Sequence, residues 1–430
     1  MADHFDAGNY NMEVGKLHSR EAAPEDHCNF AYMIHFLLGA GNLLPWNALI
    51  TAVDYFGYLY PNEHIDKVFS VAFMGSSLPV VVILVSWTNW GRRPSVGMRM
   101  NLGFLMFVAS LLTVPVMDWA YVHGARRSSK AYCVTVAAVA VCGLADGLVG
   151  GSLIGSGKEV QAILLTRHPI HTLPAGVLLS ILRIITKAAL PQTPRGLQTS
   201  AHLYFVVSTI IIVSCLVCYN ILDRLPIIQH HRCSKNLAIR SHTTLREGPP
   251  SSPTTIVLCN ANEPTARPKF WTVWKRIRWL TAGVLVTYVT TLSIFPGYIT
   301  ENVQSKLLHD WYPILLITMY NASDLVGKCS TAMYVPKSTK KVTLACFARL
   351  LFFPLFAVCM HGPAFFRTEV PVMILTSALG VTNGFLTSTL MILAPKLVHV
   401  TEVETAGILM ALFLGIGLAG GSVLGWFWLI

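Results

Sequence analysis

Long apolar stretches, each about 20 residues or more, recur from residue 29 to the C-terminus and constrain the fold more than any other feature. A helix of about 20 apolar residues can cross the hydrocarbon core of a bilayer. Only 12% of the 430 residues are charged, whereas soluble domains carry about 25%. The chain is therefore predicted to be an all-α integral membrane protein with the lipid bilayer as its partner. About eleven spans are predicted, at 29–54, 67–87, 100–120, 131–156, 169–189, 201–222, 278–299, 311–334, 342–361, 370–394 and 405–429.

The positions of the basic residues predict how the chain lies in the membrane. Residues 1–28 are polar, of mixed charge and without a cleavable signal pattern, so we expect a cytoplasmic N-terminal tail. Lys and Arg then gather in connections on the cytoplasmic side, such as Arg92 with Arg93 and Lys340 with Lys341. This topology explains the formal net charge of +11, so no nucleic-acid partner is expected.

One long polar connection, 223–277, divides the predicted spans into two groups. It is basic, and its Ser-, Thr- and Pro-rich part is expected to be disordered. The segment before it, 29–222, holds six predicted spans, and the segment after it, 278–430, holds five. Two helical bundles joined by such a linker are typical of major-facilitator-type transporters, which bind their substrate between the bundles. We therefore predict a major-facilitator-like architecture of six and five helices.

The eighth predicted span carries polar residues in its middle. Asn321, Asp324 and Lys328 follow one another at i, i+3 and i+7, so they share one face of a helix. A charged side chain at the centre of a membrane helix costs about 2.5–3.5 kcal/mol on insertion scales. We expect this face to line a polar interior. The alternative is a buried ion pair that only joins two helices.

The first predicted span contains a proline and a tryptophan near its middle. Pro45 removes a backbone hydrogen bond and is expected to break or kink the helix there. Trp46 lies too deep for an interfacial belt, and its flat face could stack a planar ligand. Packing between helices is the alternative role of Trp46.

Titratable side chains inside the spans are candidates for proton coupling, namely His35, Asp146 and Asp324. For His35, a hydrogen-bonded packing role is the alternative. Arg183 and Arg349 are expected near the ends of their spans, where long side chains reach water.

Glycines at a spacing of four residues mark two predicted spans. Small residues at this spacing let helix backbones approach closely within lipid, so a helix-packing role is predicted. The residues are Gly143, Gly147, Gly151 and Gly155 in the fourth span, and Gly417, Gly421 and Gly425 in the last span.

Enzyme chemistry has no signature in the sequence. There is no cluster of metal ligands, no nucleophile motif and no phosphate-binding loop. We therefore expect no metal, no cofactor and no enzymatic activity, with protons as the one candidate co-transported species.

Several motifs resemble one transporter family over nearly the whole chain. The most specific marks are the P-W-N of 45–47 and the D-L-V-G-K of 324–328. The other stretches are GAGNLLPWNALITAVDYF (39–56), LSILRIITKAALPQTPRGL (179–197), TLSIFPGYITE (291–301), NASDLVGKCSTA (321–332), ARLLFFPLF (348–356), NGFLTSTLM (383–391) and ETAGILMALFLGIGLAGG (404–421). They resemble the equilibrative nucleoside transporter family, and within it the land-plant branch.

The resemblance implies a function and a set of binding residues. It implies eleven spans and transport of nucleosides or nucleobases by alternating access, either facilitative or proton-coupled. The substrate-binding residues that it implies are Trp46, Phe295, Asn321, Asp324, Lys328 and Asn383. We expect the plasma membrane as the location, with the vacuolar membrane as the alternative. The sequence does not determine the oligomeric state.

Two departures from the family pattern leave a second function open. Gly150 stands where the family usually carries a Gln that binds the base, and the likeness vanishes over 157–175. A shifted reading frame would produce such a stretch, which sequencing of the transcript would test. The alternative function is a divergent family member that has lost efficient transport and acts as a binding or sensor protein.

Overall fold

The computed structural model is all-helical in its described part. The structure describes residues 30–61, 63–86, 95–121, 129–165, 175–189, 193–222, 224–225, 270–299, 305, 308–363, 366, 368–399 and 402–429. Its first half contains α2 (Phe30–Thr51), α3 (Val53–Leu59), α4 (Ile65–Ser86), α5 (Val96–Tyr121), α6 (Ser129–Leu165), α7 (Ala175–Ala189) and α8 (Pro194–Leu222). Its second half contains α10 (Phe270–Ile294), η4 (His309–Trp311), α11 (Tyr312–Met333), α12 (Thr339–Ala348), η5 (Arg349–Leu351), α13 (Phe352–His361), α14 (Glu369–Leu393), η7 (Ala394–Leu397), α15 (Val403–Leu424) and η9 (Gly425–Leu429).

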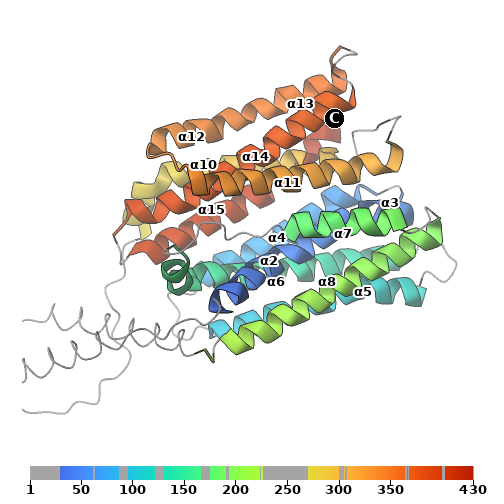
Figure 1. Cartoon of the computed structure of the whole chain (residues 1–430), viewed down its shortest axis with the longest axis horizontal. Coiled ribbons are helices and arrows are strands. Elements are labelled where there is room, and N and C mark those ends of the chain that lie inside the picture. Colours follow the sequence, from blue (N-terminus) through green and yellow to red (C-terminus); the bar gives the residue numbers. More distant parts are fainter. Residues whose placement is uncertain are drawn as a thin grey trace, which may run out of the picture.

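The helices lie in two groups (Figure 1). Helices α2 to α8, coloured blue to green, form one bundle, and α10 to α15, coloured yellow to red, form the other. Within the bundles α6 packs against α4 and α5, α11 against α14, and α10 against α15. The main contacts between the bundles join α4 to α15 and α7 to α11. The predicted linker 223–277 lies mostly outside the described residues, so the predicted domain boundaries stay a prediction.

Eight helical segments of the described residues are long and apolar enough to cross a membrane. The other three predicted spans correspond to α2, α7 and α11, so the predicted count of eleven is not confirmed. Helix α7 is described from Ala175 to Ala189, and the residues directly on either side, 166–174 and 190–192, lie outside the described part.

The first predicted span differs from expectation. Helix α2 is not interrupted at Pro45, because the helix continues from Phe30 to Thr51 with the proline inside it. The interruption comes later, at Ala52, between α2 and α3. The predicted break at the proline is therefore wrong, and a kink there stays a prediction.

Glycine lets three pairs of helices approach closely. A β-carbon added at Gly147 would lie 2.7 Å from the backbone oxygen of Ser77 in α4. One added at Gly417 would lie 2.9 Å from the backbone oxygen of Leu285 in α10. Gly143 and Gly151 also face α4, Gly421 faces α10, and Gly425 is the C-terminal cap of α15. Gly155 lies in α6, but its surroundings are outside the described residues.

The closest approach joins α11 to α14. Side chains at Gly327, Gly380 and Gly384 would collide with the backbone of the opposite helix. Because no side chain separates the two backbones, short polar side chains on one helix can reach the other. This contact positions the polar groups described next.

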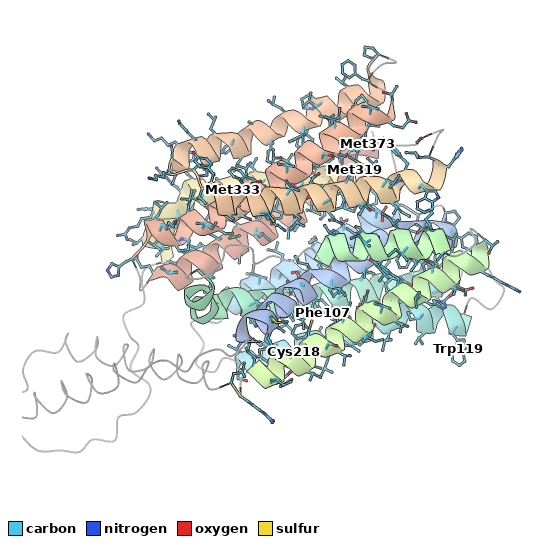
Figure 2. The ribbon with its side chains drawn as sticks, in the orientation of Figure 1. Phe107, Trp119, Cys218, Met319, Met333 and Met373 are labelled. Carbon is cyan, nitrogen blue, oxygen red and sulfur yellow. The ribbon has the colours of Figure 1, made fainter. Side chains whose placement is uncertain are left out.

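Two labelled residues in Figure 2 identify the ends of the bundles. Trp119 lies near the last residue of α5, and Met333 is the last residue of α11, at the opposite end of the molecule. We call these the Trp119 end and the Met333 end. In the predicted topology they correspond to the outer and the cytoplasmic face.

Candidate functional site

An ion pair lies in the middle of α11. Lys328 Nζ is 2.7 Å from Asp324 Oδ2, one helical turn away. The side chain of Asp324 is 15% exposed and that of Lys328 is 23% exposed. Both groups are therefore largely withdrawn from the surface but remain reachable.

The ion pair lies on an inward face of α11. Tyr320 and Gly327 are buried toward α14, whereas Val326, on the far side of the helix, is 57% exposed. Asp324 and Lys328 lie at helical positions between the α14 contact and Asn321, which contacts α7. The pair is thus turned away from the exposed side of the helix, as the sequence predicted.

A hydrogen-bonded relay continues from the ion pair into α14 and α10. Asn383 donates from Nδ2 to Asp324 Oδ1 at 2.8 Å. The hydroxyl of Thr291 lies 2.8 Å from Asn383 Oδ1, which accepts from it. Both the oxygen and the nitrogen of the Asn383 amide are hydrogen-bonded. Asn383 therefore holds Oδ1 of Asp324, the carboxylate oxygen opposite the one that faces Lys328.

Arg349 ends this relay. Its Nη2 donates to Thr291 Oγ1 at 2.7 Å, and its Nη1 donates to the backbone oxygen of Leu379 at 3.2 Å. The side chain is only 2% exposed, so the expectation that Arg349 reaches water at a span end is wrong. No carboxylate lies within ion-pair distance of it among the described residues. The relay thus contains two cations and one anion.

One polar contact crosses from α11 to the other bundle. Asn321 donates from Nδ2 to Ser180 Oγ of α7 at 3.0 Å. Ser180 is fully buried. The polar face of α11 therefore continues into the interface between the bundles.

The predicted aromatic residues lie beside this face. Phe295 stacks on Tyr320 with ring centroids 4.0 Å apart and an interplanar angle of 17°. Trp46 packs against the buried cluster that includes both rings, and also against Phe73 of its own bundle, at 5.0 Å between centroids. One face of Phe295 is therefore occupied by Tyr320, whereas Trp46 lies at the boundary between the bundles.

A second buried carboxylate lies in the N-terminal bundle. Asp146 of α6 accepts from Ser77 Oγ at 2.8 Å and from Asn42 Nδ2 at 3.3 Å. Among the described residues it has these two neutral donors and no ion-pair partner. His35 lies in α2, but its side chain is outside the described part, so these data do not test its predicted role.

A third charged cluster lies toward the Trp119 end. Arg183 of α7 forms an ion pair with Asp54 of α3, and Lys187 Nζ lies 3.4 Å from the same carboxylate. Arg183 is 1% exposed, so its expected contact with water is also wrong. Lys187 Nζ lies 5.4 Å from the ring centroid of Trp311 in the other bundle, close enough for a cation–π contact.

The other features of the described residues do not suggest a different site. No group of three or more His, Cys, Asp or Glu side chains there could hold a metal ion. One groove of about 410 Å³ lies between α4 and the C-terminal end of the chain, and it offers no polar side chain to orient a substrate. It is lined by Val68, Val71, Ala72, Val423 and Trp426.

Comparison with known proteins decides the family. The family model "Nucleoside transporter" matches residues 136–430. The chain is 49% identical to Equilibrative nucleotide transporter 8 of Arabidopsis thaliana over 410 residues, which cover 95% of this chain and 98% of that protein. It is 47% identical to Equilibrative nucleotide transporter 1 of the same plant, with coverages of 96% and 89%.

The chain belongs to the nucleoside transporter family. Its predicted place in the equilibrative, land-plant branch is confirmed. It is a multi-pass membrane transporter and not an enzyme. The structure is similar to that of a D-xylose-proton symporter, with a TM-score of 0.57 at 13% identity, over 92% of this chain and 89% of that one. This likeness confirms the major-facilitator-like fold.

In this nucleoside transporter, tertiary contacts bring together most of the residues singled out in the sequence. Asp324, Lys328 and Asn383 are joined by direct bonds, and Asn321 lies on the same face. Trp46 and Phe295 meet at one apolar cluster beside them. Asp146 belongs to the opposite bundle and does not join this group.

Sequence reasoning missed several polar residues. Thr291 is one of many threonines in apolar spans, so nothing in its local sequence separated it from a packing residue. Asp54 with Arg183 could have been found as two opposite charges within spans, since such charges usually pair. Gly380 and Gly384 repeat the four-residue spacing noted elsewhere, and that signal could have indicated the close approach of α14 to α11.

Proposed function

We propose that this protein carries nucleosides across a membrane by alternating access of its two helical bundles. The observation that carries the proposal is the Asp324–Lys328 ion pair, which lies on the inward face of α11 and is held by Asn383. The Asn383 amide orients the Asp324 carboxylate, and the remaining exposure of 15% for Asp324 and 23% for Lys328 lets a ligand reach both groups. The matching family model is named for nucleoside transport, and the relatives from Arabidopsis are named equilibrative nucleotide transporters.

The ion pair suits the hydroxyl groups of a ribose. Lys328 carries three donor hydrogens, and the bond to Asp324 uses one of them. Each oxygen of Asp324 has two lone pairs, so both can accept further bonds. A pair of neighbouring hydroxyls can accept from the ammonium group and donate to the carboxylate at the same time. Net affinity then requires both members of the pair.

Aromatic residues supply the surface for the planar base. Trp46 lies at the boundary between the bundles and is only partly buried. Stacking of a base on an aromatic ring contributes about 1–3 kcal/mol in other proteins. Phe295 is stacked on Tyr320 and only 5% exposed in this conformation, so it contributes to base binding only when the bundles part.

Alternating access requires the contacts between the bundles to break at one end at a time. Two contacts join α7 to the other bundle: Lys187 lies over Trp311 of η4, directly before α11, and Asn321 of α11 bonds to Ser180. We propose that the first of these holds the Trp119 end closed in this conformation. That end would be the outer face if the N-terminus is cytoplasmic.

Uptake by the purified protein in proteoliposomes tests the proposal. Radiolabelled uridine and adenosine are expected to enter, and a matched panel with the free bases and nucleotides defines the substrate class. Asp324→Asn should abolish uptake, because it removes the acceptor charge and leaves Lys328 unpaired. Lys328→Arg, which keeps the charge, serves as the control. Unchanged uptake by Asp324→Asn would refute the role of the pair.

A binding or sensor function is the second candidate. Gly150 and the divergent stretch 157–175 favour it, because both depart from the family pattern. Retention of nucleoside binding in the complete absence of uptake would support this function over transport.

Proton coupling and location form part of the proposal. Asp146, with only neutral donors among the described residues, is the candidate proton acceptor. Uptake that rises with an inward proton gradient would support symport, and uptake that ignores the gradient would support facilitation. We place the protein in the plasma membrane with a cytoplasmic N-terminus. Imaging of a tagged protein would separate this from the vacuolar membrane.

A further inference from the structure

Asn42 carries a buried oxygen without a hydrogen-bond partner. Its Nδ2 donates to Asp146 Oδ1, but its Oδ1 has no partner among the described residues. An unpaired buried acceptor is costly, and such groups in native proteins usually have a functional reason. The transport role proposed for the Asp324 site leaves this oxygen unexplained.

The orientation of the Asn42 amide follows from its neighbour. An ionised carboxylate only accepts hydrogen bonds, so the NH₂ group of Asn42 must face Asp146. A flipped amide would set its carbonyl oxygen against the carboxylate. Ser77 holds the other oxygen of Asp146 at 2.8 Å. The carbonyl oxygen of Asn42 is therefore held away from the carboxylate as a fixed acceptor.

The position of Asn42 relates it to Trp46. Asn42, Trp46 and Ile50 follow one another at intervals of four residues, so they share one face of α2. Ile50 and Trp46 both pack against the cluster that includes Phe295 of the other bundle. The same face of α2 thus points toward the interface between the bundles. The β-carbons of side chains one helical turn apart lie about 5–6 Å from each other. A base stacked on Trp46 can therefore bring its edge to Asn42.

The backbone of α6 leaves room beside this amide. A β-carbon built at Gly150 would find its three nearest neighbours in Asn42 alone, at 3.4, 3.7 and 4.0 Å. No other atom of the described residues lies nearer to that point. A larger side chain at position 150 would occupy the space next to the Asn42 amide, whereas glycine keeps it free.

We infer that Asn42 Oδ1 selects the base by accepting a hydrogen bond from an N–H group on its edge. The inference rests on the proposed nucleoside transport and adds a specificity residue to it. The base stacks on Trp46 and turns its donor edge toward Asn42 when the bundles part. Asp146, which accepts from the Asn42 amide, acts as the positioning residue for that oxygen. Nucleosides whose base bears an N–H donor are the preferred substrates.

Two purine nucleosides that differ in one donor test the inference in the unmodified protein. Adenosine carries an exocyclic amino group, whereas purine riboside lacks any N–H on its base. We expect uptake efficiency in proteoliposomes to favour adenosine about tenfold, the usual order for one hydrogen bond in an enclosed site. Equal efficiencies would overturn the inference and leave nucleoside transport intact. Absence of uptake for both would refute the transport proposal and this inference with it.

Variants separate base selection from helix packing. Asn42→Ala should lower adenosine uptake toward that of purine riboside and bring their ratio close to one. Gly150→Leu, which fills the space beside the amide without removing it, should do the same. Ser77→Ala is the matched control, because it removes a bond to Asp146 but keeps the Asn42 oxygen, so the ratio should persist. Equal losses for both substrates in Asn42→Ala, or a lost preference in Ser77→Ala, would assign Asn42 to packing.

Discussion

Asp324 and Asp146, one carboxylate from each helical bundle, are stabilised in different ways. Asp324 in the C-terminal bundle faces Lys328 at 2.7 Å and an orienting amide. Asp146 in the N-terminal bundle faces a hydroxyl and an amide, both neutral. Removing Asp324 or Lys328 leaves the other charge unpaired. The partners of Asp146, in contrast, are the neutral dipoles of Ser77 and Asn42. Aspartate therefore has two roles: Asp324 forms a charged pair suited to binding in the C-terminal bundle, and Asp146 orients Asn42 in the N-terminal bundle.

The largest effect that we expect from this difference between Asp324 and Asp146 is on the stability of the folded protein. Asp324→Asn should destabilise the protein strongly, because breaking a buried ion pair costs about 3–5 kcal/mol. Adding Lys328→Met should restore most of the lost thermal stability without restoring uptake. Asp146→Asn should change the melting temperature far less, since the new amide oxygen can accept from Asn42 and the new NH₂ group can donate to the Ser77 hydroxyl. Thermal unfolding in detergent measures all three, and equal losses for Asp324→Asn and Asp146→Asn would remove the distinction.

Close helix contact around Asp324 should make its bundle sensitive to added volume. Gly384→Ala places a methyl group against the backbone of α11 at Asp324. Overpacking of this kind costs about 1–3 kcal/mol, so both thermal stability and nucleoside uptake should fall. Gly39→Ala in α2, where nothing lies within 4 Å, should leave both unchanged. An unaffected Gly384→Ala would show that α11 and α14 can separate without cost.

The relay behind Asp324 should have a moderate effect. Thr291→Val removes the hydroxyl that joins Arg349 to Asn383, and one such bond contributes about 1 kcal/mol. The concentration for half-maximal uptake should rise several-fold while the protein stays folded. Thr389→Val makes the same change at a buried hydroxyl without a described partner and should have little effect. Similar results for the two variants would argue against a positioning role of the relay.

The smallest effect is expected at Asp146 under matched pH on both sides. Asp146→Asn keeps an acceptor for Asn42 and offers its NH₂ group to the Ser77 hydroxyl, so uptake without a gradient should change by less than about threefold. If protons accompany the substrate through this carboxylate, the variant should lose any stimulation by an imposed proton gradient. Uptake assayed with and without the gradient checks both parts. A variant that keeps full stimulation would exclude Asp146 as the proton carrier.

Much of the fold was predictable, because apolar length and helical periodicity are local properties. Eight of the predicted spans coincide with described helices that are long and apolar enough to cross a membrane. The spacing of Asn321, Asp324 and Lys328 placed them on one face before any contact was known. Pro45 was misleading for the same reason. A proline weakens a helix locally, but packing from both bundles around Trp46 keeps α2 continuous.

The site was only partly predictable, since its bonds join distant segments. The bond between Asn383 and Asp324 spans 59 positions, and the pairing of Arg183 with Asp54 spans 129. The sequence does not distinguish an arginine that is buried, such as Arg183 or Arg349, from one that reaches water. Their difference depends on which acceptors the neighbouring helices supply.

The sequence by itself determined that the chain is a bundle of membrane helices with a charged face turned inward, because a bilayer excludes unpaired charge and unsatisfied backbone. Only the tertiary structure decided which partners hold those charges. Glycines at the contact of α11 with α14 bring Asn383 within hydrogen-bond distance of Asp324. In the N-terminal bundle, Asn42 of α2 donates a hydrogen bond to Asp146 of α6. Both residues are aspartates, so helix packing and not residue type decides that Asp324 forms a binding pair with Lys328 and that Asp146 orients Asn42.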